Sequence, residues 1–134
     1  MNWQLSQFLR FCVVGTAGFL VDAGTTILLT QMLSVEATLA RLVAFLIAVS
    51  VTWALNRRFT FHVDVSGSTW LPYLMSSSLG ALINVAIYLL WLRWAGHSGT
   101  QILAAVAIGS IGALAFNFTI SRYVIFRANR LPPA

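Results

Sequence analysis

The chain has 134 residues, of which 59% are hydrophobic and only 8% are charged. Because a soluble domain carries roughly 25% charged residues, this composition, with a mean hydropathy of +0.85, excludes an ordinary water-soluble domain. The net charge of +5 comes from eight arginines and three acids. These arginines flank apolar runs, so they indicate orientation in a membrane and argue against nucleic-acid binding.

Four apolar segments are long enough to cross a bilayer, which takes about 20 helical residues for a hydrocarbon core of roughly 30 Å. In chain order they span about residues 11–33, 37–56, 70–92 and 98–121. No small-x-small cleavage signature closes the first run, so we expect it to stay in the mature protein. The sequence predicts an all-α integral membrane four-helix bundle, with residues 1–134 forming a single transmembrane domain.

Arginine is distributed unevenly between the two sides of these segments. A cytoplasmic amino terminus leaves two arginines, Arg41 and Arg93, toward the outside and places six inside, namely Arg10, Arg57, Arg58, Arg122, Arg127 and Arg130. Basic residues favour the cytoplasmic side of a membrane. The bias therefore predicts four spans with both termini in the cytoplasm, and it argues against dual topology.

An internal repeat relates the two halves of the chain. A shift of 65 residues places Ala40, Ala44, Ala48, Thr52, Asn56 and Arg57 on Ala105, Gly109, Ala113, Asn117, Ser121 and Arg122. A shift of 62 places Gly15, Gly18 and Asp22 on Ser77, Gly80 and Asn84. Two spans per half return the chain to the same side, so the pattern predicts two helical-hairpin repeats in parallel orientation. Stripes of small residues also invite close helix contacts, and we expect a homo-oligomer, most simply a dimer.

Two charged residues lie deep in the predicted spans. At 1.5 Å per helical residue, Asp22 lies about 17 Å and Arg41 about 24 Å above the cytoplasmic edge. Inserting an isolated aspartate at the centre of a membrane-spanning helix costs about 2.5–3.5 kcal/mol, so Asp22 should have a partner. The side chain of Arg41 is long enough to reach it. Two interpretations stay open: a structural ion pair, or a polar binding site that includes Asn84, the repeat mate of Asp22.

Polar residues also gather at the predicted cytoplasmic ends of the second and fourth spans. They are Asn56, Arg57 and Arg58 in the first group and Asn117, Ser121 and Arg122 in the second. Guanidinium groups bind phosphate bidentately, so this cluster is suited to an anionic lipid headgroup. The alternative is ordinary positive-inside anchoring, which explains the arginines but not the two asparagines.

Signatures of catalysis and of metal binding are absent from the sequence. The single cysteine, Cys12, excludes a disulfide within the chain, and His62 and His97 have no acids or cysteines at metal-ligand spacing. No nucleophile, paired-carboxylate or phosphate-loop pattern is present. Serines 76–78 are expected to bond their own helix backbone. We therefore expect neither an enzyme nor a cofactor or metal site.

The motifs at the span ends resemble the GtrA-like family. They are Phe8-Leu-Arg-Phe11 followed by Val14-Gly15, Gly18 and Asp22, then Asn56-Arg-Arg-Phe-Thr-Phe61, then Ser121-Arg-Tyr-Val-Ile-Phe126. The resemblance covers nearly the whole chain. It implies a protein of the bacterial cytoplasmic (inner) membrane that moves a polyprenyl-phosphate-linked sugar, such as one on undecaprenyl phosphate, across the bilayer for cell-surface polysaccharide synthesis.

Under this interpretation membrane lipids, the lipid-linked sugar and a membrane glycosyltransferase are the partners, and the substrate-binding residues are Asp22, Arg41, Asn56, Arg57, Arg58, Asn84, Asn117 and Arg122. One alternative is a proton-coupled exporter like the small multidrug resistance family, with Asp22 as its carboxylate. The charge bias and the parallel repeat argue against that fold. A second alternative is a non-transporting membrane partner of a glycosyltransferase.

Overall fold

The structure is a computed structural model that describes residues 2–63 and 68–127. Within these residues, four long helices have the length and hydropathy to cross a membrane. The elements are α1 (Trp3–Ile27), η1 (Leu28–Met32), α2 (Ala37–Leu55), η2 (Asn56–Thr60), α3 (Trp70–Ala95), α4 (Gly99–Ile120) and η3 (Ser121–Ile125). The chain is therefore all-α with four membrane-capable helices, as the sequence predicted. Asp64 and Arg130 lie outside the described residues.

The helices extend beyond the predicted spans at several ends. The first begins at Trp3, ahead of the apolar run that starts at Phe11. Three short π-helical segments, η1, η2 and η3, continue α1, α2 and α4. In η2 the amide of Phe61 donates to the Asn56 carbonyl at 2.9 Å, and in η3 the amide of Phe126 donates to the Ser121 carbonyl at 3.0 Å. The wider π turn thus ends both hairpins just before a phenylalanine.

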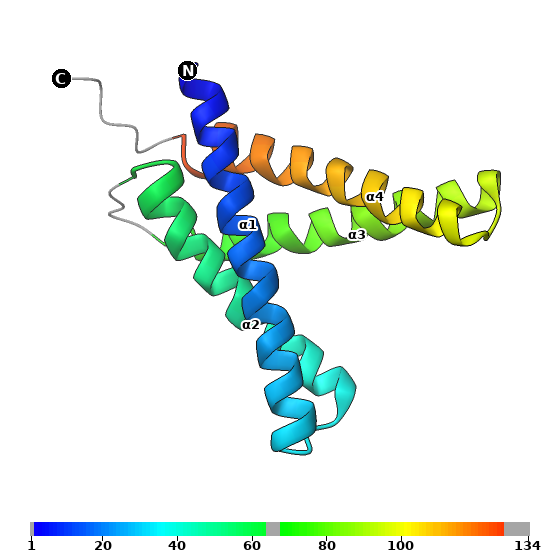
Figure 1. The fold of residues 1–134 in the computed structure, drawn as a ribbon. Helices are drawn as coiled ribbons and strands as arrows, with labels where there is room; N and C mark the ends of the chain where they lie inside the picture. Colours follow the sequence, from blue (N-terminus) through cyan, green and yellow to red (C-terminus); the bar gives the residue numbers. More distant parts are fainter. Residues whose placement is uncertain (1, 64–67, 128–134) are drawn as a thin grey trace.

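The four helices form two hairpins, α1 with α2 and α3 with α4. Figure 1 shows the hairpins diverging from a shared end, where α1 begins and η3 ends, so that the two hairpin tips lie far apart. Contacts between the hairpins are few and come mainly from α2 against α3. The predicted four-helix bundle is therefore formed only at the shared end, and along the rest of their length each hairpin packs by itself.

An aromatic cluster joins the hairpins at the shared end. Phe61 stacks on Phe126 with ring centroids 4.9 Å apart, and Phe118 contacts Phe11 at 5.4 Å. Phe126 is fully buried, and Tyr73 belongs to the same core. Aromatic pairs of this geometry contribute about 0.5–1.5 kcal/mol each beyond their buried area. The cluster thus holds together four segments that are far apart in the sequence.

The small-residue stripes pack within the chain. Ala40, Ala44 and Ala105 have no exposed surface, and Gly109 is buried against Asn84. Since these stripes are used inside the hairpins, they supply no surface for a second copy. The dimer stays a prediction that rests on the small interior of the chain alone.

The two hairpin tips are shaped by capping. Glu36 accepts hydrogen bonds from the amides of Thr38 and Leu39 at 2.9 and 3.0 Å and so caps α2. These backbone bonds stabilise the carboxylate and lower the pKa of Glu36. At the other tip α3 ends at Gly96, whose φ of +90° favours glycine, and Ser98 caps α4. Both tips are tight turns between antiparallel helices.

Candidate functional site

A cleft of about 320 Å³ lies between the hairpins and is lined by residues of all four helices. We call it the central cleft. Apolar residues form most of its walls, and its polar side chains are Asp22, Thr52, Asn56, Tyr73, Ser77, Asn84 and Asn117. Four of the predicted site residues are brought together here: Asp22, Asn56, Asn84 and Asn117. The four predicted arginines lie outside this lining.

Asp22 and Arg41 form an ion pair between α1 and α2. Arg41 donates from Nη1 to Asp22 Oδ2 at 2.7 Å, and Thr26 lies 3.4 Å from the same nitrogen. The Asp22 side chain is 20% exposed and that of Arg41 is 59% exposed. The prediction from helical rise that Arg41 lies within reach of Asp22 is therefore confirmed. The pair lies at the edge of the central cleft, with the aspartate facing inward.

Two acceptor oxygens in the central cleft have no donor. Asp22 Oδ1 and Asn117 Oδ1 are both buried, and among the described residues neither has a hydrogen-bond partner. A buried acceptor without a donor is destabilised by roughly 1–3 kcal/mol. Such atoms in a cleft are satisfied when a bound molecule brings hydroxyl or amide donors. The cleft is thus suited to a hydroxyl-bearing group.

Glycines make room for the polar side chains of the cleft. A methyl group added at Gly80 would collide with the Asn117 amide, and one added at Gly18 would collide with Thr52. A methyl group added at Gly109 would lie 2.8 Å from the Asn84 carbonyl oxygen. Real Cβ atoms do not approach this closely, because packed interiors leave no such overlap. Glycine therefore allows a polar side chain to sit between closely packed helices in each hairpin.

Asn56 lies at the floor of the central cleft, where both its amide nitrogen and its amide oxygen make hydrogen bonds. Its Nδ2 donates to the Tyr73 hydroxyl at 2.8 Å, and its Oδ1 accepts from Thr60 at 2.8 Å. Only 1% of Asn56 is exposed. Tyr73 is only 5% exposed, and this hydrogen bond ties α3 to η2. This network fixes the end of the cleft.

The arginines of the predicted phosphate-binding cluster, Arg57, Arg58 and Arg122, lie on the π-helical segments at the shared end. Arg57 lies over the Trp53 ring at 5.5 Å and Arg58 over Phe59 at 5.7 Å. Arg122, which is only 6% exposed, lies 5.2 Å from the Tyr123 ring centroid. Cation–π contacts of this kind hold a guanidinium in place. The end of each hairpin thus carries oriented positive charge.

Three residues that line the cleft were not predicted as site residues from the sequence, namely Thr52, Tyr73 and Ser77. The repeat alignment contains a signal for two of them, because Thr52 aligns with Asn117 and Ser77 with Gly15. Of the three serines expected to bond their own helix backbone, Ser78 donates to the Leu74 carbonyl at 2.9 Å, whereas the buried Ser76 hydroxyl has no hydrogen-bond partner among the described residues. Tyr73 carries no sequence signal that separates a buried tyrosine from an interfacial one.

Arg10 was counted only as an orientation signal, and the structure gives it contacts with η2. Its Nη1 donates to the Phe59 carbonyl at 3.2 Å and lies 3.3 Å from His62 Nε2. It also lines a second, apolar groove between α1 and α2.

Among residues 2–63 and 68–127, no group of three or more His, Cys, Asp or Glu could hold a metal ion.

Four long apolar helices, an ion pair between α1 and α2, and a cleft lined in part by polar side chains define a multi-pass integral membrane protein. The sequence matches the GtrA/DPMS transmembrane domain family over residues 10–128. The chain belongs to this family, which confirms the resemblance. Proteins of the GtrA family are small membrane proteins linked to polysaccharide synthesis, and they are not known catalysts.

Proposed function

We propose that this protein moves a polyprenyl-phosphate-linked sugar across the bacterial cytoplasmic membrane for cell-surface polysaccharide synthesis. The observation that carries the proposal is the central cleft, in which Asp22 Oδ1 and Asn117 Oδ1 lack donors among the described residues. A sugar supplies hydroxyl donors to such acceptors. The hairpins diverge from their shared end toward their tips (Figure 1), so the prenyl chain can stay in the bilayer while the sugar passes.

The polar residues divide into two roles under this proposal. Arg57, Arg58 and Arg122 attract the phosphate at the cytoplasmic end, since guanidinium groups match phosphate geometry. Asp22, Asn84 and Asn117 contact the sugar farther along, while Asn56 fixes the floor of the cleft. Arg41 keeps Asp22 in place through the ion pair at 2.7 Å.

We further propose that the two hairpins are repeats in parallel orientation. The support is a matching contact in each half: Gly18 of α1 accommodates Thr52 of α2, and Gly80 of α3 accommodates Asn117 of α4. The shifts of 62 and 65 residues align these same positions. Two polar side chains at related places would give the sugar successive contacts on the two sides of the cleft.

A cytoplasmic location for both termini can be tested by cysteine labelling. In a Cys12→Ser background, we expect a membrane-impermeant maleimide added to intact spheroplasts to label His97→Cys and to leave Asn2→Cys unlabelled. Both positions are exposed in the structure, so access depends on the side of the membrane. Labelling of Asn2→Cys alone would reverse the orientation and move the arginine cluster to the outside.

Reconstitution tests the transport proposal directly. Purified protein in vesicles that contain undecaprenyl-phosphate glucose should increase the rate at which the sugar becomes accessible to an impermeant oxidant. Vesicles without protein give the reference rate, which is slow because a charged, hydroxylated headgroup must cross hydrocarbon. An unchanged rate, together with higher activity of an added membrane glycosyltransferase, would instead support the non-transporting partner.

A further inference from the structure

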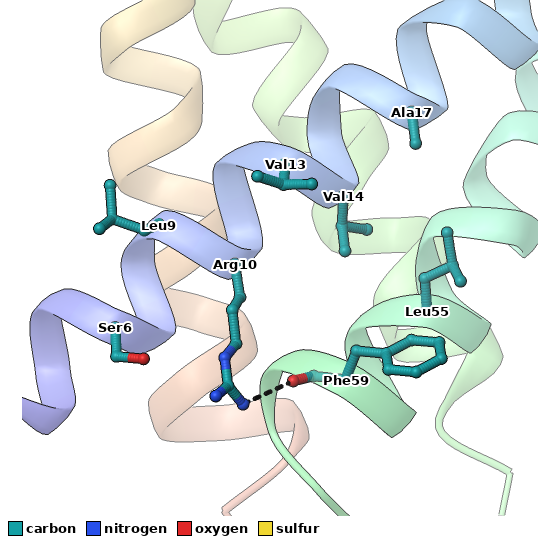
Figure 2. Close-up of a pocket in the computed structure, with 8 residues that line it drawn as sticks. All are labelled: Ser6, Leu9, Arg10, Val13, Val14, Ala17, Leu55 and Phe59. Atoms are coloured by element: carbon teal, nitrogen blue, oxygen red, sulfur yellow. Dashed lines mark hydrogen bonds between the residues drawn. The ribbon is translucent and has the colours of Figure 1, made fainter.

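A second cavity lies on the outer face of the first hairpin, away from the central cleft. It has a volume of about 590 Å³ and is lined by Ser6, Leu9, Arg10, Val13, Val14, Ala17, Leu55 and Phe59. Figure 2 shows α1 on one side and α2 with η2 on the other, with Arg10 reaching across to the Phe59 carbonyl. We call it the lateral groove. None of its lining residues except Val14 is buried, so the groove is open to the bilayer.

The walls of the lateral groove are mostly hydrocarbon, and each carries a row of apolar side chains. Val13 and Ala17 are four residues apart on α1, and Leu55 and Phe59 are four residues apart on the opposite wall. Residues at this spacing form one row along a helix face. From Arg10 to Ala17 the groove extends about 10 Å into the membrane. Two facing rows of this length fit the first part of one hydrocarbon chain.

Positive charge is concentrated at one end of the lateral groove. Among the described residues, both hydrogen bonds of Arg10 use Nη1, which leaves Nη2 and Nε for an anion. His62 is in contact with Arg10, and Arg58 lies over Phe59, which lines the groove. Of the described acids, neither Asp22 nor Glu36 lines it. A cation at the end of an apolar groove is complementary to a phosphate that carries a hydrocarbon tail.

We infer that the lateral groove is the docking site of the polyprenyl phosphate in the inner leaflet, with Arg10 at the phosphate and Val13, Ala17 and Leu55 against the first isoprene units. The inference rests on the proposed function and adds to it a loading site distinct from the central cleft. α1 separates the two, because Arg10 and Val13 face the groove while Gly15 and Asp22 line the cleft. The substrate docks laterally before its sugar enters the cleft.

The test is a groove-filling substitution in the full chain, compared with a matched control. Val13 is 69% exposed and lines the groove, whereas Met75 on α3 is 65% exposed and lines neither cavity. Native mass spectrometry in lipid nanodiscs would measure the binding of undecaprenyl phosphate. We expect Val13→Trp to weaken it about tenfold, the factor for excluding about two buried methylene groups, and Met75→Trp to leave it unchanged.

Two further measurements separate the possible occupants. Arg10→Gln keeps a donor for the Phe59 carbonyl but removes the charge, so it should weaken binding and flatten its dependence on salt. A photoactivatable undecaprenyl phosphate should cross-link to α1 near Val13. Equal displacement by phosphatidylglycerol would overturn the inference in favour of an ordinary phospholipid contact. Cross-links confined to the central cleft would overturn the groove alone, whereas no binding to the wild-type protein would overturn the proposed function as well.

Discussion

Gly109→Ala should separate α4 from α3 and destabilise the protein by about 2 kcal/mol, in the range of overpacked interiors. The added methyl group would lie 2.8 Å from the carbonyl oxygen of Asn84, which is part of the α3 backbone. Relief of this clash therefore requires movement of a whole helix. That movement also displaces the Asn84 side chain from the central cleft, so transport should fall together with stability.

Gly112→Ala is the matched control on the same helix. A methyl group there would meet the terminal carbon of Ile87, the far end of a flexible side chain that can turn aside. Gly112→Ala should therefore lower the free energy of unfolding by less than about 1 kcal/mol, as do core substitutions that nearly conserve side-chain volume. Reversible unfolding of both variants in mixed micelles compares them. Equal stability of the two variants would show that α3 and α4 are not as closely packed as the structure has them.

The helices and the ion pair could be predicted from the sequence because both depend on local periodicity. Apolar runs of sufficient length define spans, and helical rise places Asp22 and Arg41 within reach of each other. The structure joins the two side chains at 2.7 Å, in agreement with this expectation. The polar end of each small-residue stripe likewise indicated Asn117 as a residue of interest, and it lies in the central cleft.

The arrangement of the hairpins could not be predicted, because it depends on contacts between distant residues. Phe61 and Phe126 are 65 residues apart and stack at 4.9 Å. Phe11 joins them from the start of the chain through a contact with Phe61 at 6.2 Å. Aromatic residues at span ends can equally face lipid headgroups. Only the fold shows that these rings face one another and leave the hairpins free to diverge.

The role of Arg10 in the lateral groove likewise could not be predicted from the sequence. A basic residue at the start of a span is explained fully by the positive-inside rule, so its sequence position gives no sign of a binding role. Arg10 lies at the end of the lateral groove because it donates to the Phe59 carbonyl on a different helix. That contact requires the π turn of η2 and the crossing of α1 over α2, neither of which follows from periodicity.

Blocking the central cleft should stop transport without harming the fold. Ser77 lines the cleft and is half-buried, whereas the neighbouring Ser78 is also half-buried but does not line it. Because Cys12 is the single cysteine, a Cys12→Ser background gives each new thiol a unique position. A small methanethiosulfonate at residue 77 adds a side chain that occupies the space proposed for the sugar, and a reducing agent removes it.

The decisive measurement is the rate of undecaprenyl-phosphate glucose translocation by reconstituted Ser77→Cys before modification, after modification and after reduction. If the central cleft is the path of the sugar, modification should lower the translocation rate to that of protein-free vesicles, and reduction should restore it fully. The rate of Ser78→Cys should not change on modification. Transport that continues at its original rate after complete modification of residue 77 would contradict the account.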